Sequence, residues 1–288
     1  KINQSMNSQH KANILDYYNS CEWQYRMMWH LTDDMSISIG YWDKNVSNFR
    51  KARFYQNKAF AEWVNIQPTD KVLDAGCGVG GSSVWIAKNI GCQVEAITLV
   101  PRQKELADKN IEKNGVRDKV NVTVMDYHNL NFPDESFDVV WALESFCYAD
   151  PKSRFVQEAF RVLKKGGRLI IIDLYQGKEN LTPAENELLY TKTMNPMAVA
   201  SMETMEQIKG HALKAGFEKC TVKDISPNVL PALRIIYWIS LLAFPFAKLG
   251  YWLKRFTKRE HESMILGVYA KKAYKQGLTI YGSVIAWK

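Results

Sequence analysis

Short apolar runs alternate with segments of helical spacing between about residues 70 and 175. The runs are rich in β-branched and aromatic residues, as strands are, and they cover 71–75, 93–99, 120–125, 137–143 and 168–174. Between two of them, Pro101 opens and Gly115 closes a segment with the signals of a helix start and a helix C-cap. Strands that alternate with helices predict right-handed crossovers and a parallel, doubly wound α/β sheet.

The flanking segments complete the predicted organisation. A helix over 202–217 leads into a strand over 218–225, and 278–288 forms a terminal strand, which predicts a seven-stranded, mostly parallel sheet. The expected parts are a helical N-terminal cap (1–63), a core (64–175), a lid insertion (176–203), a core helix and strand (204–225), an apolar helical lid (226–277) and the last core strand (278–288).

The segment 230–260 fits two roles. Its apolar run over 235–247 carries no charge, but we expect it to be too short to span a bilayer, which takes ~20 apolar residues, and Pro245 interrupts it. Trp238, Trp252 and a basic flank favour a peripheral position in a membrane interface. The same apolar side chains fit a helical lid over an apolar substrate cavity, and the two roles do not exclude each other.

Charge and cysteine content narrow the classes of function. The net charge is +8, but the basic residues are scattered and their only dense run is Lys254, Arg255, Lys258 and Arg259, so we expect no nucleic-acid partner. The five cysteines are odd in number and widely spaced, and no cluster has metal-ligand spacing, so we expect reduced thiols and no metal. We expect a cytoplasmic protein because the beginning of the sequence lacks the apolar stretch of a secretory signal. The sequence leaves the oligomeric state open.

A glycine-rich turn follows the first predicted strand. The strand ends at Asp74, and Gly76, Gly78, Gly80 and Gly81 come directly after it. Glycine at the carboxyl edge of such a strand lets the backbone approach a bound molecule closely. A nicotinamide site would also need an acidic residue about 20 positions on, at the end of the second strand. Thr98 and Leu99 stand there, which disfavours a nicotinamide oxidoreductase.

Several motifs in order resemble one family. "VLDAGCGVGG" (72–81) resembles the first motif of class I S-adenosylmethionine-dependent methyltransferases, and "ITLVPRQ" (97–103) is similar to a segment of the branch with sterol, tocopherol and mycolic-acid methyltransferases. "VMDYHNLNFPDESFDVVWALES" (124–145) and "AFRVLKKGGRLIIID" (159–173) resemble the motifs that follow. The resemblance covers roughly 15–175 and the last strands. It implies a Rossmann-like methyltransferase fold with S-adenosyl-L-methionine as the cofactor.

The resemblance also implies which residues hold that cofactor. Asp74 would orient the glycine loop near the methionine ammonium group, and Gln103 would contact the ribose. Asp126 would accept a hydrogen bond from the adenine amino group, and Tyr127 would pack beside the adenine ring. The full set of expected cofactor residues is Ser38, Trp42, Asp74, Gly76, Cys77, Gly78, Thr98, Leu99, Gln103, Asp126 and Tyr127.

A second motif bears on the chemistry. "MSISIGYWD" (35–43) is similar to an aromatic motif that closes over the cofactor in tocopherol and related methyltransferases, which makes Ser38, Tyr41 and Trp42 lid candidates. The rings of the last two fit core packing equally well. The expected catalytic residues are Glu144, as a base at the end of the fourth strand, and Tyr41 and Tyr148, whose rings with that of Trp42 would stabilise a cation. Alternatively, Glu144 only hydrogen-bonds the cap.

Departures from the family pattern shape the expected function. Cyclopropane-forming relatives carry a cysteine and a histidine in the segments where Ile39 and Tyr148 stand here, and sterol methyltransferases usually carry a histidine at the second position. These departures argue against cyclopropanation and count against a sterol acceptor. We expect methyl transfer to a hydrophobic small molecule, such as a terpenoid, sterol-like or quinol lipid, at carbon. The alternatives are N- or O-methylation of a natural product, and a non-catalytic lipid-binding relative.

Overall fold

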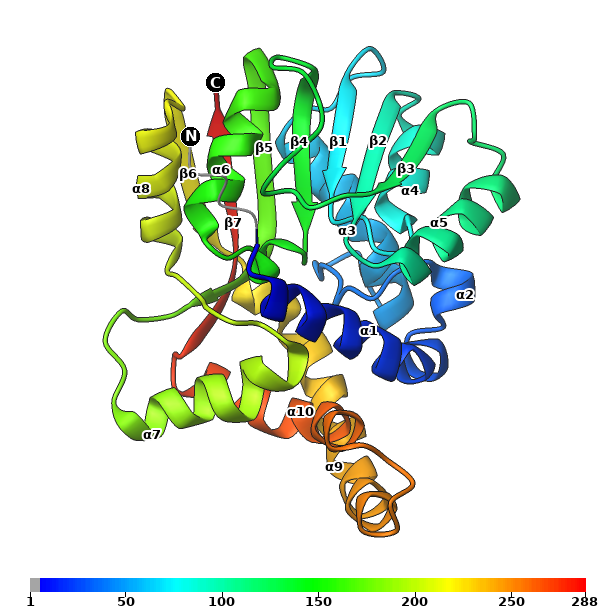
Figure 1. Ribbon diagram of the computed structural model, residues 1–288, viewed down its shortest axis with the longest axis vertical. Coiled ribbons are helices and arrows are strands. Elements are labelled where there is room, and N and C mark those ends of the chain that lie inside the picture. The colour runs from blue at the N-terminus through cyan, green and yellow to red at the C-terminus, as the bar shows by residue number, and fades with distance from the viewer. Residues whose placement is uncertain (1–5) are drawn as a thin grey trace.

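A computed structural model describes residues 6–288 of the chain, so positions 1–5 of the predicted cap lie outside the described residues. Seven strands form one sheet in the order β3-β2-β1-β4-β5-β7-β6 (Figure 1). Neighbours from β3 to β5 are parallel, and β7 is antiparallel to both β5 and β6. The predicted doubly wound, mostly parallel sheet is therefore confirmed. The strands are β1 (Lys71–Ala75), β2 (Gln93–Thr98), β3 (Val120–Val124), β4 (Phe137–Leu143), β5 (Leu163–Gln176), β6 (Lys219–Asp224) and β7 (Thr279–Trp287).

Helices cover both faces of the sheet because its central strands are apolar on both sides. In β4, Val139 and Trp141 belong to one buried cluster, and Val140 and Ala142 belong to another on the opposite face. The first face is covered by α3 (Phe49–Trp63), α4 (Gly81–Asn89) and α5 (Pro101–Lys113). The second face is covered by α6 (Lys152–Val162) and α8 (Met205–Ala215). A strand buried on both faces is typical of a parallel sheet.

The carboxyl edge of the sheet carries the remaining helices. Figure 1 shows α1 (Ser8–Met28) running across the ends of the strands, and α2 (Leu31–Asp34) follows it. Ile14, Tyr17 and Cys21 lie on one face of α1 at helical spacing and are buried in the core. The predicted insertion after β5 holds α7 (Pro183–Asn186), a π-helix (Glu187–Met194) and a short 3₁₀ turn (Asn195–Met197).

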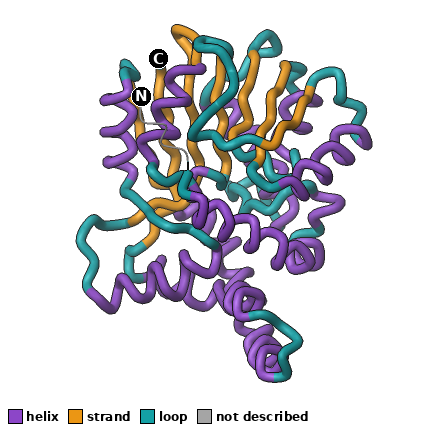
Figure 2. The backbone as a smooth tube through the Cα atoms, viewed as in Figure 1, coloured by secondary structure: helices purple, strands orange, loops and turns teal. Residues whose placement is uncertain are grey.

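Two long helices, α9 (Ser226–Trp252) and α10 (Lys258–Lys275), form a hairpin that leaves the body of the molecule at this edge (Figure 2). The expectation that Pro245 interrupts the apolar run is wrong, because α9 continues through both Pro231 and Pro245. Pro245 is exposed, so a carbonyl that lacks its helical donor there can face solvent. The expectation that this run is too short is also corrected. With 27 residues and a mean hydropathy of 1.7 over its most apolar window, α9 is long and apolar enough to cross a membrane by length and composition.

Candidate active site

A first cavity of about 400 Å³ lies at the carboxyl edge, between the glycine loop, the end of β2, the loop after β3 and the N-terminal cap. Most of the expected cofactor residues line it. They are Ser38, Gly76, Cys77, Gly78, Thr98, Leu99, Gln103, Asp126 and Tyr127. Segments far apart in the sequence thus meet around one space, as the family resemblance implies.

The glycine loop is shaped by two different requirements. Gly76 has a φ of +102°, and a Cβ there would lie 2.3 Å from the Cβ of Ser145, so the packing of the protein itself demands glycine. Gly78 has a φ of +55°, and a Cβ there would meet no atom of residues 6–288 within 4 Å. Since Gly78 lines the first cavity, that open space is available to a bound molecule. We call this open space at Gly78 the cradle. It fits part of an S-adenosylmethionine molecule.

Asp74 does not line the cavity, although the resemblance places it near the cofactor. It is buried, and its carboxylate accepts a hydrogen bond of 2.6 Å from the hydroxyl of Ser83 in α4. Burial raises the pKa of Asp74 to about 6, and the hydrogen bonds from Ser83 oppose this. Asp74 therefore holds the end of β1 to the start of α4, and its effect on a cofactor would pass through the glycine loop between them.

Gln103, in the first turn of α5, is oriented by a hydrogen bond with the last residue of β2. The hydroxyl of Thr98 donates to Oε1 of Gln103 at 2.8 Å, so the side-chain amide nitrogen is left to donate elsewhere. Both residues line the first cavity. An amide donor at this point fits the hydroxyl groups of a ribose, which accept hydrogen bonds.

Asp126 is oriented by the residue two positions further on. Oδ1 of Asp126 accepts hydrogen bonds from the backbone N–H of His128 at 2.9 Å and from its ring Nδ1 at 2.7 Å. The other ring nitrogen of His128 accepts from the backbone N–H of Asp150, so Nδ1 carries the proton. Burial alone would raise the pKa of Asp126, but the hydrogen bonds from His128 lower it below its ordinary value. Among the described residues, the ionised Oδ2 meets only the backbone N–H of Met6 at 3.3 Å, a long contact that an adenine amino group could replace.

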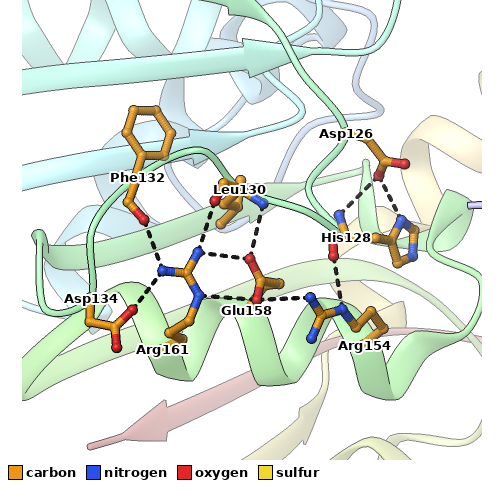
Figure 3. A network of polar contacts seen from close by, with 8 residues as sticks. All are labelled: Asp126, His128, Leu130, Phe132, Asp134, Arg154, Glu158 and Arg161. Carbon is orange, nitrogen blue, oxygen red and sulfur yellow. Dashed lines mark hydrogen bonds and ion pairs between the residues drawn. The ribbon is translucent and has the colours of Figure 1, made fainter. Parts of the chain in front are cut away.

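A charged network fixes the loop that carries Asp126 to helix α6 (Figure 3). The guanidinium of Arg154 donates to the carbonyl of His128, and the buried carboxylate of Glu158 accepts from the backbone N–H of Leu130 at 2.9 Å. Glu158 also pairs with Arg161 at 2.8 Å. Arg161 reaches three acceptors along the loop, which are the carbonyls of Leu130 and Phe132 and the carboxylate of Asp134. The position of Asp126 therefore depends on α6.

A second cavity of about 220 Å³ adjoins the first and is mostly lined by aromatic and aliphatic side chains. Its walls come from α1, the π-helix, α9, α10 and β7. Four of the described residues line both cavities, namely Tyr18, Ile37, Glu144 and Tyr148. Two of the three expected catalytic residues, Glu144 and Tyr148, therefore stand at the junction. The hydroxyl of Tyr18 donates to that of Tyr148 at 3.1 Å, which fixes the two rings together.

Glu144 holds an unusual position at the end of β4. Its backbone adopts a positive φ of 50°, and its Oε1 accepts hydrogen bonds from the hydroxyl of Tyr281 at 2.7 Å and from the backbone N–H of Ile39 at 3.0 Å. No residue within 6–288 donates to its Oε2. Burial raises the pKa of Glu144 to about 7, and the two hydrogen bonds moderate that rise. Glu144 therefore makes the expected hydrogen bond to the N-terminal cap, at Ile39, and also lines both cavities.

The second cavity contains polar groups that the sequence analysis missed. Asp173 is buried within β5, just past the last residue that pairs with β4. Its carboxylate accepts from the backbone N–H of Cys147 at 2.8 Å, and burial raises its pKa to about 6. The acid that closes the run "LIIID" (169–173) was a usable signal, because it follows an apolar strand segment near the ligand edge of the sheet. Tyr18 and Tyr281 gave no such signal, since their roles depend on contacts between distant parts of the chain.

The structure places Tyr41 and Trp42 outside the lining of both cavities. The ring of Tyr41 stacks on Tyr55 and meets Phe60 and Trp63 edge-on, in the core beside α3. Trp42 joins the start of α9 through its backbone N–H, which donates to the carbonyl of Asn228 at 2.9 Å. The ring of Tyr41 thus serves packing, the second interpretation of the motif, and Ser38 is the member of the motif's lid candidates that reaches the cofactor cavity.

Within 6–288 no group of three or more His, Cys, Asp or Glu side chains is arranged to hold a metal ion.

Comparison with known proteins agrees with this geometry. Residues 73–171 match the model of a family described as a methyltransferase domain. The chain is 33% identical to the 2-methyl-6-phytyl-1,4-hydroquinone methyltransferase of Synechocystis, over 78% of this chain and 71% of that protein. It is 31% identical to the 27-O-demethylrifamycin SV methyltransferase of Amycolatopsis mediterranei, over 68% and 72%. A cyclopropane synthase of Mycobacterium tuberculosis has the same fold, with a TM-score of 0.81 and 15% identity over 99% of both chains. The chain therefore belongs to the class I methyltransferases that use S-adenosyl-L-methionine as their cofactor.

Proposed function

We propose that this enzyme transfers a methyl group to a carbon atom of a hydrophobic small molecule held in the second cavity. The observation that carries the proposal is the position of Glu144, a carboxylate with a pKa of about 7, at the junction of the cofactor cavity and a mainly apolar cavity. A group that lines both spaces is within reach of the atom that receives the methyl group.

The lining of the second cavity supports a hydrophobic acceptor. Aliphatic and thioether side chains, including those of Leu233, Ile236 and Met194, form much of its wall, and polar groups are few. The Synechocystis relative is named for a hydroquinone with a phytyl chain, which is an acceptor of this class. A quinol or terpenoid lipid would bury its chain in such a cavity and present its ring or alkene to Glu144.

The chain's own residues would then perform three tasks. S-adenosylmethionine supplies an electrophilic methyl group when bound, so no further activation of the methyl group is required. The walls of the cavities exclude water and align the acceptor. The faces of Tyr18 and Tyr148 stabilise positive charge that develops on the acceptor by cation–π attraction. As the new C–C bond forms, the bond between the methyl group and the sulfonium sulfur would break and release S-adenosylhomocysteine. The same acceptor carbon then loses its proton to Oε2 of Glu144, and the electron pair of the C–H bond stays with the acceptor.

O-methylation of a natural product is the second candidate. The Amycolatopsis relative is named for a methyl group on oxygen. Glu144 would serve there as well, because a base that removes a hydroxyl proton makes the oxygen a better nucleophile. The two candidates therefore differ in the product and share the base.

The experiment compares Glu144→Gln with the wild type, using cofactor labelled on its methyl group and a lipid extract as the source of acceptor. Turnover should fall by roughly 10² or more, the scale of a lost general base, while calorimetry shows S-adenosylhomocysteine affinity close to normal. Glu112→Gln, at an exposed position on α5, should leave both unchanged. Undiminished turnover in Glu144→Gln would refute the assigned base. A labelled product methylated on oxygen or nitrogen would replace carbon methylation by the second candidate or its nitrogen counterpart.

A further inference from the structure

Exposed apolar side chains gather on the outer half of α9 and the start of the turn to α10. We call residues 238–253 the tip surface. Leu242, Phe246 and Trp252 are its most exposed members, at 70%, 71% and 76%. Elsewhere in 6–288, the large apolar residues that are exposed stand apart on separate elements. The exposed large apolar residues of the tip surface are Trp238, Leu241, Leu242, Phe244, Phe246, Leu249, Tyr251, Trp252 and Leu253. A contiguous apolar patch of this kind marks an interaction site.

The charges beside the tip surface have one sign. Residues 226–257 contain four basic residues and no acidic one. Three of the basic residues, Lys248, Lys254 and Arg255, are exposed, and none of these three forms an ion pair with another residue within the described chain. An apolar patch with unneutralised positive charge complements an anionic lipid surface, where acyl chains meet acidic headgroups.

The hairpin presents this surface away from the rest of the molecule (Figures 1 and 2). Its base is firmly anchored, since Ser226, Val229 and Ala232 are buried. The hairpin itself is tightly packed, because the backbone N–H of Gly267 in α10 donates to the hydroxyl of Ser240 in α9. A Cβ at Gly267 would lie 2.7 Å from the carbonyl oxygen of Ile236.

This packing argues that α9 lies in the membrane interface and does not cross the bilayer. Helix α10 runs beside α9 and carries charged side chains, including Arg259, Glu260 and Lys271. If α9 crossed, its partner would bring these charges into the hydrocarbon layer at a large cost. Insertion of the tip surface alone keeps α10 and its charges in water.

The same hairpin also forms one wall of the second cavity. Leu233 and Ile236 of α9 line the cavity together with Met264 and Ala270 of α10. One element therefore carries both the apolar tip surface and part of the wall around the acceptor. An acceptor dissolved in a bilayer would meet this hairpin first.

We infer that the tip surface docks the enzyme on anionic membranes, with its apolar side chains in the interface and with Lys248, Lys254 and Arg255 on acidic headgroups. A hydrophobic acceptor then passes from the membrane along the hairpin to the second cavity. The docking stands on the hairpin alone, whereas the transfer of an acceptor rests on the proposed function.

Vesicle sedimentation of the full chain tests the docking without cofactor or acceptor. The wild type should bind vesicles of phosphatidylcholine with phosphatidylserine, and added salt should weaken the binding. The triple variant K248E/K254E/R255E should lose affinity by at least on the order of 10²-fold, because losing three basic contributions near the surface already costs that much. The variant K113E/K165E/K214E changes the net charge equally at exposed positions near the opposite edge, and it should bind like the wild type.

A second variant tests the apolar component. L242S/F246S/W252S changes three exposed side chains, so its fold and its affinity for S-adenosylhomocysteine should be unchanged, while vesicle binding falls. Equal vesicle binding by the wild type and both tip variants would overturn the inference. Absence of vesicle binding, with self-association that L242S/F246S/W252S abolishes, would also overturn it and assign the tip surface to a second copy of the chain.

Turnover separates docking from the proposed function. With the acceptor supplied in anionic vesicles, K248E/K254E/R255E should lose most of its turnover, and with the acceptor in detergent it should match the wild type. Equal turnover from vesicles would refute delivery along the hairpin. If the wild type failed to methylate a hydrophobic acceptor even in detergent, the proposed function would fall, and the vesicle-binding result would stand on its own.

Discussion

At the scale of single residues, the proposed base Glu144 links activity to pH. Burial raises the pKa of Glu144 to about 7, the nearby charge of Asp173 adds to that rise, and hydrogen bonds from Tyr281 and Ile39 oppose it. A general base works only when deprotonated. We therefore expect kcat to rise with pH through about 7 and to level off above it, as a pH–rate profile would show. A kcat that is flat from pH 5 to 9 would contradict this role.

Tyr281 tunes that ionisation, and its removal has a predictable sign. Its hydroxyl bonds the ionised carboxylate of Glu144, which lowers the pKa, so Tyr281→Phe should raise the pKa and move the rising limb of the profile to higher pH. Cofactor affinity should be unchanged, because Tyr281 lines the second cavity only.

Tyr175→Phe is the matched control for this substitution. The hydroxyl of Tyr175 is also buried but has no partner among the described residues. Its loss should therefore leave the rising limb of the pH–rate profile at the same pH. If Tyr281→Phe and Tyr175→Phe gave the same profile, the tuning role of Tyr281 would be refuted.

At the scale of elements, the glycine loop allows two alanine substitutions with different expected outcomes, since Gly76 faces the protein and Gly78 faces the cofactor cavity. Gly76→Ala forces a contact of 2.3 Å with Ser145, so it should lower the free energy of unfolding, by about 1–3 kcal/mol from overpacking alone. Gly78→Ala meets no atom and should cost only the roughly 1–2 kcal/mol of a side chain in left-handed backbone. Because its Cβ enters the cradle, it should weaken S-adenosylhomocysteine binding by about tenfold, or about 1.4 kcal/mol. Calorimetry measures the S-adenosylhomocysteine affinity, and chemical denaturation measures the free energy of unfolding. Unchanged affinity in Gly78→Ala would show that the cofactor does not occupy the cradle.

The network between α6 and the loop of Asp126 gives a second prediction at this scale. Glu158→Ala leaves Arg161 and the N–H of Leu130 without their buried partner, so unfolding free energy should fall by about 3 kcal/mol. Affinity for S-adenosylhomocysteine should fall too, because the loop no longer fixes Asp126. The exposed pair of Lys58 and Glu62 is the control, and Glu62→Ala should change stability by less than about 1 kcal/mol. Similar losses in both variants would contradict the network's role.

At the scale of the whole molecule, the sequence predicted what local periodicity and strand order determine. The apolar runs marked the parallel strands, and the turn at Gly78 and the acid at Asp126 marked the ligand edge of the sheet. The continuity of α9 was missed because a proline was judged without its surroundings. On the exposed side of a helix, a proline need not end the helix, because the carbonyl that loses its hydrogen-bond donor can face solvent.

The acceptor side of the site was harder to predict for a physical reason. Glu144 meets Ile39 across 105 positions of sequence and Tyr281 across 137, and Tyr18 meets Tyr148 across 130. No periodicity of 2 or 3.6 residues carries information about such pairs. The same aromatic residue types also fill ordinary cores, which is where Tyr41 lies.

The contact between the cap and the hairpin has a thermodynamic consequence. The indole N–H of Trp23 in α1 donates to the carboxylate of Glu260 in α10 at 2.7 Å, and its ring stacks on Phe256 at the end of the hairpin turn. Helix α1 also borders the cofactor cavity through Ile14 and Tyr18. If lipid attachment shifts the hairpin and thereby strengthens cofactor affinity, reciprocity requires the loaded enzyme to hold lipid more tightly by the same factor. Under the proposed function, the methyl donor would then accumulate on those enzyme molecules that are already attached to the membrane that holds the acceptor.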